Sequence, residues 1–326
     1  MSTTTEMRYV NAVTQALRDC MEQDPTVVVM GEDVANAGGS FKATRGLLDT
    51  FGPGRVIDTP ISESAIASAA VGMALTGMKP VVEIMFMDFI TLSMDALVNQ
   101  AAKARYMFGG QGSVPMVLRT PHGGGLSAGP QHSQCLEAWL AHIPGLKVVC
   151  PSCPQDAYSL LRAAIADPDP VMFIEHKAMY ANKGEVDTAK TARIGEARIA
   201  RAGRDVTLVT YGATVNVCLK AADQLGKEGM EAEVVDLRSI QPWDKAAVLE
   251  SLSRTHRAVV VHEAVQAFGV GAEIVATIAD EGFDELDAPV LRVAAPFMPA
   301  PFASSLEKGY AVTVDRVMDA VRKTLA

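Results

Sequence analysis

Residues 55–89 have the sequence RVIDTPISESAIASAAVGMALTGMKPVVEIMFMDF, in which a run of small side chains separates two apolar stretches. The stretches RVID (55–58) and PVVEIMF (80–86) are short and apolar, which predicts two strands. The residues from about 64 to 76 predict a helix between them. Strands that alternate with helices in this way predict a parallel sheet covered by helices on both faces.

The same alternation continues on both sides of this stretch. A buried strand is predicted at TVVVMGED (26–33), and further strands at VPMVLRT (114–120), LKVVCP (146–151) and PVMFIEH (170–176). Helices are predicted between them, among them one long helix over residues 89–106. We therefore expect an α/β domain of three layers over residues 1–185.

A second run of alternating elements follows a segment of scattered charges at 186–203, which we interpret as a linker. The stretches DVTLVTYG, AEVVDLR, AVVVHE and VLRVA predict short strands separated by helices. We therefore expect a second, smaller α/β domain with a parallel sheet over residues 204–326.

The composition is that of a globular protein and argues against nucleic acid or membrane as a partner. Hydrophobic residues make up 49% and charged residues 21% of the chain, which is an ordinary globular balance. The 29 basic and 38 acidic residues give a net charge of -9, and no basic stripe is present that would neutralise a phosphate backbone. No apolar stretch approaches the roughly 20 residues that span a bilayer.

The amino-terminal sequence and the cysteine content favour a cytoplasmic location. The start MSTTTEMRYVNAV resembles neither a signal peptide nor a transit peptide. Five cysteines are an odd and sparse set, which indicates a reducing compartment. Cys150 and Cys153 are spaced as C-x-x-C, but a structural zinc site usually needs a second pair of ligands. We interpret KVVCPSCP as the end of a buried strand followed by a turn.

Two side chains are candidates for acid–base chemistry. Glu63 follows a predicted strand, at the edge where open parallel sheets bind ligands. By position alone, however, an acidic residue in the first turn of a helix is the favoured interpretation. His132, in PQHSQ, has an imidazole whose ordinary pKa suits proton transfer near neutrality, although a histidine at a helix start also serves as a cap or a solvated turn residue.

The segment HGGGLSAG (122–129) contains two fragments that are typical of serine hydrolases. HGGG matches an oxyanion loop, and GLSAG matches a nucleophile elbow around Ser127. In a hydrolase these two parts come from separate strands, so one loop cannot supply both. We therefore favour a flexible loop that allows close approach of the backbone over a serine hydrolase.

Taken in order, these segments resemble the β subunit of the decarboxylating component of 2-oxo acid dehydrogenase complexes, in the transketolase-like thiamine-diphosphate superfamily. The resemblance spans nearly the whole chain and is carried by GEDV (31–34), RVIDTPISE (55–63), AVGMALTGMKPVVEIMFMDF (70–89), NQAAKARYMFGG (99–110), QHSQ (131–134), IPGLKVVCPSCPQDA (143–157), EVVDLRSIQPWD (233–244) and APVLRVAAP (288–296). It implies a transketolase-like pyrimidine-binding domain over 1–185 and a transketolase C-terminal-type domain over 204–326.

The resemblance implies roles for four side chains. Glu63 matches the glutamate that hydrogen-bonds the aminopyrimidine ring of thiamine diphosphate. A carboxyl group that shares a proton with this ring favours the imino tautomer, whose nitrogen removes the thiazolium proton. Phe89 matches the aromatic residue that stacks on the ring, and Met85 a neighbouring wall of the pocket. His132 matches the histidine that handles protons of bound intermediates and helps the lipoyl group receive the acyl fragment.

The resemblance also implies metal ions and a partner subunit. In relatives a potassium ion is held partly by backbone oxygens, and the matching positions are Met116, Ala164, Ile165, Asp167 and Asp169, the last in place of an asparagine of some relatives. The family motif for diphosphate and magnesium begins Gly-Asp-Gly, which this sequence lacks. An α-type subunit would therefore supply the motif in an α2β2 heterotetramer. The C-terminal domain would serve assembly, including docking to the lipoyl-bearing acyltransferase core.

Acetoin, pyruvate and branched-chain 2-oxo acids are the substrates that the resemblance implies, for an oxidoreductase with a lipoyl disulfide acceptor. The blocks ARYMFGG, LRTPHGGG, HIPGLKVVCPS, EHKAMY and GEV resemble acetoin dehydrogenase β subunits most closely, by a small margin over pyruvate. A split transketolase subunit is the alternative with the same cofactor. It would need several His and Arg residues for a sugar phosphate, and the loops offer few.

Overall fold

The computed structural model describes residues 4–325, which form two compact units. Within these residues the first unit contains 4–122 and 139–194, and the second contains 123–138 and 195–325. The predicted first domain includes the segment 123–138, which packs here with the second unit. The compact units therefore do not have the same limits as the predicted domains, and the limits 1–185 and 204–326 stay a prediction.

The first unit alternates strands and helices along the chain. Its elements are β1 (Thr4–Arg8), α1 (Tyr9–Gln23), β2 (Val27–Gly31), α2 (Leu47–Phe51), β3 (Val56–Asp58), α3 (Glu63–Leu75), β4 (Lys79–Glu83), the 3-10 helix η1 (Met87–Ser93), the π-helix η2 (Ala96–Ala101), α4 (Ala102–Met107), β5 (Val117–His122), β6 (Lys147–Val149), α6 (Pro154–Ala166), β7 (Val171–His176), the 3-10 helix η3 (Lys177–Met179) and β8 (Lys183–Asp187). Helix α5 (Glu137–Ala141) begins in the second unit, and its residues from Trp139 onward belong to the first.

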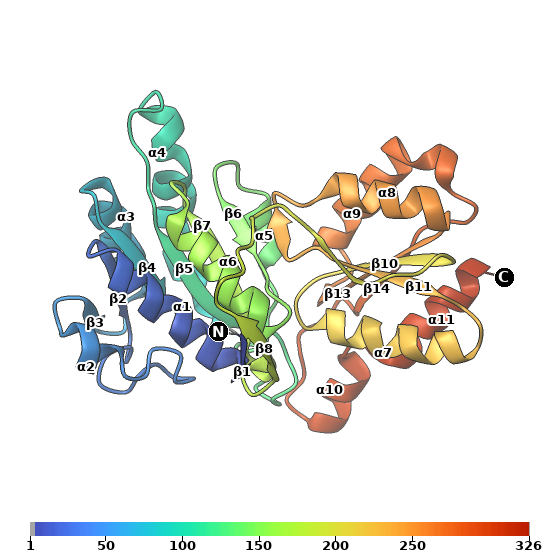
Figure 1. Ribbon diagram of the computed structural model, residues 1–326, viewed down its shortest axis with the longest axis horizontal. Helices are drawn as coiled ribbons and strands as arrows, with labels where there is room; N and C mark the ends of the chain where they lie inside the picture. Colours follow the sequence, from blue (N-terminus) through green and yellow to red (C-terminus); the bar gives the residue numbers. More distant parts are fainter. Residues whose placement is uncertain (1–3, 326) are drawn as a thin grey trace. The chain divides into compact units, whose positions relative to one another are not determined.

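Within the first unit the parallel strands follow the order β6-β7-β5-β4-β2-β3. Helices α1 and α6 lie side by side across one face of this sheet (Figure 1). Right-handed crossovers put α3 and α4 on the opposite face, because the steps from β3 to β4 and from β4 to β5 run opposite to the step from β6 to β7. The predicted parallel sheet with helices on both faces is confirmed.

Two features of the first unit differ from the sequence prediction. Residues 89–106 were expected to form one long helix, but they are divided among η1, η2 and α4. The buried Ser93 hydroxyl donates to the Glu63 carbonyl at 2.9 Å, which fixes the 3-10 segment against the start of α3. In addition, β1 pairs with β8 in a separate antiparallel ribbon that no period in the sequence indicated.

The second unit has its own sheet, of order β14-β13-β10-β11-β9. Its elements are β9 (Arg198–Arg201), β10 (Val206–Thr210), α7 (Thr214–Lys227), β11 (Ala232–Asp236), β12 (Ser239–Gln241), α8 (Lys245–Thr255), β13 (Ala258–Val265), α9 (Val270–Glu281), the 3-10 helix η4 (Phe283–Glu285), β14 (Leu291–Ala295), α10 (Ser304–Tyr310) and α11 (Val314–Leu325). Helices α8 and α9 cover one face and α7 and α11 the other (Figure 1). The sheet is parallel as predicted, except that β9 runs antiparallel to β11.

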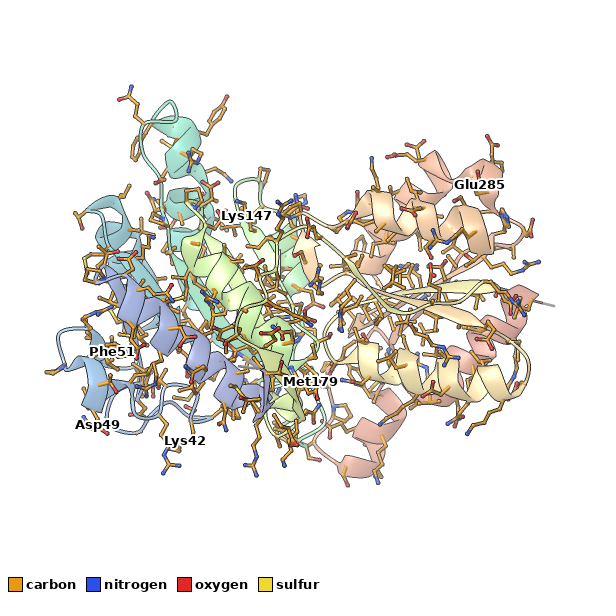
Figure 2. All side chains as sticks on the ribbon, viewed as in Figure 1. Lys42, Asp49, Phe51, Lys147, Met179 and Glu285 are labelled. Atoms are coloured by element: carbon orange, nitrogen blue, oxygen red, sulfur yellow. The ribbon has the colours of Figure 1, made fainter. Side chains whose placement is uncertain are left out.

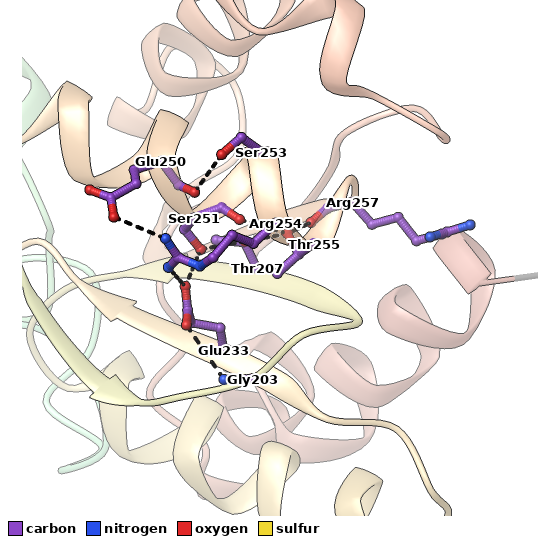
Figure 3. A network of polar contacts seen from close by, with 9 residues as sticks. All are labelled: Gly203, Thr207, Glu233, Glu250, Ser251, Ser253, Arg254, Thr255 and Arg257. Atoms are coloured by element: carbon purple, nitrogen blue, oxygen red, sulfur yellow. Dashed lines mark hydrogen bonds and ion pairs between the residues drawn. The ribbon is translucent and has the colours of Figure 1, made fainter.

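A buried polar network joins α8 to this sheet (Figure 3). The Glu233 carboxylate on β11 accepts hydrogen bonds from the Arg254 guanidinium at 2.7 Å and from the Ser251 hydroxyl at 2.6 Å. Thr207 on β10 shares hydrogen bonds with Ser251 at 2.6 Å and with Thr255 at 2.7 Å. Because buried polar groups are costly unless they are paired, this network makes the packing of α8 specific.

No helix in residues 4–325 is both long enough and apolar enough to cross a membrane. The five cysteines, all within these residues, are free thiols.

Candidate active site

The carboxyl ends of three strands of the first unit stand level with one another. Gly31 at the end of β2 pairs in register with Asp58 on β3 and with Glu83 on β4. A Cβ atom at position 31 would lie 2.7 Å from the Glu83 carbonyl oxygen, so only glycine allows this approach. The Asp58 carboxylate accepts from the Ala35 backbone N–H at 2.6 Å and fixes the loop after β2. Three loops therefore meet at this edge of the sheet, where ligands of open parallel sheets bind.

Glu63 is the first residue of α3, just beyond this edge, and its side chain is half-buried. The helix start is a favourable place for a carboxylate because of the free N–H groups there. Its backbone carbonyl is held by Ser93, as described above. The structure therefore fixes the Glu63 main chain while leaving its carboxyl group accessible to a ligand.

Half-buried aromatic and thioether side chains follow β4 at the same edge. Phe89 lies edge-to-face with Phe86 at a centroid distance of 5.8 Å, and Phe86 lies edge-to-face with Phe41 at 5.7 Å. Met85 directly precedes this group and is half-buried as well. Since η1, which carries Phe89, packs on α3, the first unit brings together an acid and aromatic rings. This combination fits a heteroaromatic ring that stacks on one side and accepts or donates a hydrogen bond at its edge.

A second acid, Glu32, belongs to the same edge. Burial raises the pKa of the Glu32 carboxyl from its ordinary value, and the negative charges of Asp33 and Glu63 raise it further. Glu32 was not among the site residues predicted from the sequence, although it lies in the GEDV block. The signal was its position directly after a buried strand.

An ion cluster lies inside the sheet directly below this edge. The Arg119 guanidinium on β5 donates to Glu83 at 2.7 Å and to both oxygens of Glu175 on β7, at 2.7 Å and 2.9 Å. The Tyr180 hydroxyl also donates to Glu175, at 2.8 Å. Burial raises the pKa of Glu83, and Arg119 opposes that rise. The cluster connects β4, β5 and β7. Its member on β4, Glu83, is two residues before Met85 in the sequence.

His132 belongs to the second unit, so the first unit by itself does not bring it to Glu63. It lies half-buried in the segment 123–138, where its backbone N–H donates to the Gly129 carbonyl at 3.3 Å. Ser127, the serine of the hydrolase-like fragment, lies in the same segment. Its hydroxyl donates to the Glu307 carboxylate at 3.2 Å, which is not the partner that would activate a nucleophilic serine.

The five positions matched to a potassium site gather at one end of β5 and α6 in the first unit. The Met116 carbonyl accepts from the Val171 N–H, and the Ala164 carbonyl accepts from the Asp167 N–H. Lys147, labelled in Figure 2, is the first residue of β6. Its ammonium group donates to the Asp167 carboxylate at 2.7 Å, and Asp169 pairs with Arg105. Both acidic side chains therefore have cationic partners, and an ion here would depend on backbone oxygens, Ile165 included.

Comparisons with known proteins place this chain in a family. The transketolase pyrimidine-binding domain matches residues 5–183, and the transketolase C-terminal domain matches residues 195–317. The pyruvate dehydrogenase E1 component subunit beta-2 of Oryza sativa is 44% identical over 323 residues, which cover 98% of this chain and 86% of that protein. The chain belongs to the E1 β-subunit family of 2-oxo acid and acetoin dehydrogenases.

Two bacterial E1 β subunits are equally similar. The 2-oxoisovalerate dehydrogenase subunit beta of Bacillus subtilis is 44% identical, with 97% of this chain and 98% of that one covered. The acetoin:2,6-dichlorophenolindophenol oxidoreductase subunit beta of Cupriavidus necator is 45% identical, with 96% of each chain covered. The E1 β-subunit family is a family of oxidoreductase components, and transketolase-family E1 enzymes use thiamine diphosphate.

A solved structure titled as a split-gene transketolase, an inactive β4 tetramer, has the same fold. It superimposes with a TM-score of 0.82, covers 98% of each chain and is 22% identical. The transketolase-like fold predicted for the E1 β subunit is thereby confirmed. The likeness extends over both units and says nothing about the substrate.

Proposed function

We propose that this E1 β subunit provides the aminopyrimidine half of a thiamine-diphosphate site, with Glu63 as the activating acid. The observation that supports the proposal is the half-buried carboxyl group of Glu63 at the start of α3, with the aromatic ring of Phe89 on the segment packed against that helix. When bound, thiamine diphosphate would supply a nucleophilic carbon for chemistry at the carbonyl group of the substrate.

The side chains of this unit then have separate tasks. Glu63 holds a proton at the edge of the aminopyrimidine ring, Phe89 stacks on the ring face, and Met85 excludes water beside it. His132 moves protons of the bound substrate fragment during its transfer. Because the chain lacks the Gly-Asp-Gly motif, we propose that an α-type partner holds the diphosphate and magnesium in an α2β2 heterotetramer.

The proposed reaction cleaves acetoin, or decarboxylates a 2-oxo acid, and passes the acyl group to a lipoyl acceptor on an acyltransferase core. We place acetoin slightly ahead of pyruvate because of the sequence blocks that resemble acetoin dehydrogenases. Overall identity does not separate the substrates, since the acetoin relative is 45% identical and the pyruvate relative 44%. The free thiols are compatible with the proposed cytoplasmic location.

The test is a lipoyl- or dye-linked assay of the reconstituted α/β pair with acetoin, pyruvate and 2-oxoisovalerate. We expect turnover that requires thiamine diphosphate and the α subunit, with acetoin as the best substrate. Good pyruvate turnover without acetoin turnover would reverse the substrate assignment. A rate that does not respond to thiamine diphosphate would contradict the function itself.

We also propose a potassium ion that is held partly by backbone oxygens at the positions Met116, Ala164, Ile165, Asp167 and Asp169. The support is the pairing of the nearby carboxylates with Lys147 and Arg105, which leaves the backbone as the ligand set. The midpoint of thermal unfolding should be higher in potassium chloride than in sodium chloride at equal ionic strength. Equal midpoints would contradict this proposal.

A further inference from the structure

The segment 123–138 contains His132 but forms no strand of its own. Gly123, Gly125 and Gly129 have positive φ angles, and Ser127 has a φ of 53°, which is an unfavourable backbone conformation for a residue with a side chain. A stretch with such a backbone keeps one conformation only if the surrounding structure holds it. The residues that hold this backbone in place therefore also position His132.

Two carboxylates of the second unit hold the first half of the segment. Glu307 on α10 is 7% exposed and accepts from the Gly125 N–H at 2.8 Å and from the Ser127 N–H at 3.0 Å. Glu263 on β13 accepts from the Gly124 N–H at 2.7 Å. These bonds join backbone N–H donors to carboxylate oxygens, and hydrogen bonds of this kind are stronger than those between two amide groups.

The glycines of the segment leave no space between it and this support. A Cβ atom at Gly124 would lie 3.3 Å from the Glu307 carboxylate. A Cβ atom at Gly129, whose φ is +75°, would lie 2.2 Å from the ring of Phe302. Residues 124–129, which precede His132, therefore pack closely against Phe302 and Glu307.

The far end of the segment has a separate support. Glu137, five residues after His132, is fully buried, and the Tyr211 hydroxyl donates to its carboxylate at 2.8 Å. The Tyr211 ring is parallel to that of His262, with an interplanar angle of 8° and a centroid distance of 6.2 Å. His132 is thus flanked on both sides in the sequence by residues that the second unit holds.

We propose that Glu307, Glu263 and Tyr211 are positioning residues for His132, so that the C-terminal unit has a catalytic task beyond assembly. The inference rests on the proposed role of His132, but the holding of the segment can be measured without it. Removing the Glu307 carboxylate frees two backbone N–H groups and one hydroxyl. A misplacement of His132 by about 1 Å would lower turnover roughly 10- to 100-fold.

The first experiment measures hydrogen–deuterium exchange of peptides covering 123–138 in the full chain. Glu307→Ala should accelerate exchange at these peptides at least about tenfold, whereas Glu307→Gln, which keeps one acceptor oxygen, should have a smaller effect. The matched control is Glu281→Ala, an exposed glutamate of α9 that pairs with Lys245. Exchange in Glu307→Ala as slow as in the control would overturn the proposal.

The second experiment separates kcat from KM in the α/β pair. We expect Glu307→Ala to lower kcat with KM for the substrate unchanged, and Glu307→Gln to restore part of the loss. If Glu307→Ala does not fold, Tyr211→Phe removes only the hydroxyl that binds Glu137, and the same drop in kcat is expected. A kcat within twofold of wild type in a folded variant would overturn the positioning role.

The two experiments distinguish failure of this inference from failure of the proposed function. If the wild-type pair turns over none of the three substrates, the proposed function is wrong. The exchange measurement still decides then whether the carboxylates hold the segment. If the wild-type pair is active and the variants behave like Glu281→Ala, only the positioning inference is wrong.

Discussion

Substitution of Arg119 by methionine is the perturbation whose cost follows most directly from the structure. Arg119 is 1% exposed, and its three hydrogen bonds join it to Glu83 and Glu175, which are also buried. Methionine fills similar space but leaves two carboxylates without their cation. Removing one partner of a buried ion pair typically costs about 3 to 5 kcal/mol of unfolding free energy, and we expect a loss in that range near pH 8.

The loss should depend on pH in a defined direction. Burial raises the pKa of Glu83 above its ordinary value of 4.5, and Arg119→Met removes the positive charge that opposes that rise. A carboxyl group whose pKa is raised on folding destabilises the protein as the pH rises through that pKa. Arg119→Met should therefore be most destabilised near pH 8 and should recover stability as the pH falls towards 5.

The assay is urea unfolding of the full chain at pH 8 and pH 5, followed by far-UV circular dichroism. The matched control is Lys183→Met, which breaks an exposed ion pair with Glu6 and should change stability by less than about 1 kcal/mol. The double variant Arg119→Met/Glu83→Gln should regain part of the loss, since it removes one buried charge. A loss below about 1 kcal/mol at pH 8, or one that grows towards pH 5, would refute the reasoning.

Three further outcomes are expected. Burial, followed by the charge of Arg292, lowers the pKa of His262 from 6.5 to about 4. The unfolding free energy should therefore fall by about 3 kcal/mol as the pH falls from 6.5 to 4, because only the unfolded chain takes up the proton over this range. The variant His262→Phe should lose this dependence when unfolding is measured along an acid titration. Gly129→Ala should destabilise the chain by about 1 to 3 kcal/mol in thermal unfolding, with partial recovery in Gly129→Ala/Phe302→Ala; a neutral Gly129→Ala would contradict the contact. Glu233→Ala should cost about 3 kcal/mol because it removes the buried acceptor that Arg254 and Ser251 share, and a cost below that of Glu281→Ala would argue against the network.

The fold and the family could be predicted from the sequence. The fold depends on the hydrophobic periodicity within each element, and the family is indicated by the order of the matching sequence blocks along the chain. Short β-branched stretches alternating with helices predicted both parallel sheets, and the order of the blocks changed Glu63 from a helix-start acid to a candidate cofactor residue. The long helix expected over 89–106 was wrong because a tertiary contact, from Ser93 to Glu63, sets a 3-10 segment where the apolar period alone favours an α-helix.

The support of the His132 segment could not be predicted from the sequence. Glu307 and Ser127 are 180 residues apart, and no local pattern joins a carboxylate on α10 to a glycine-rich loop. Strand β9 (Arg198–Arg201) was also missed, because it lies in the segment 186–203 that the sequence indicated as a linker, and its antiparallel pairing with β11 depends on pairing partners rather than on side-chain period. Contacts between distant segments decide both features.

The role of Glu63 as the activating acid is measured most directly by the exchange of the thiazolium C2 proton for deuterium. Thiamine diphosphate is bound to the reconstituted α/β pair, and the exchange rate is compared for wild type, Glu63→Gln and the control Glu281→Gln. We predict that Glu63→Gln slows exchange at least roughly 100-fold while the cofactor remains bound, and that the control matches wild type. An unchanged exchange rate in Glu63→Gln with the cofactor bound would contradict the account.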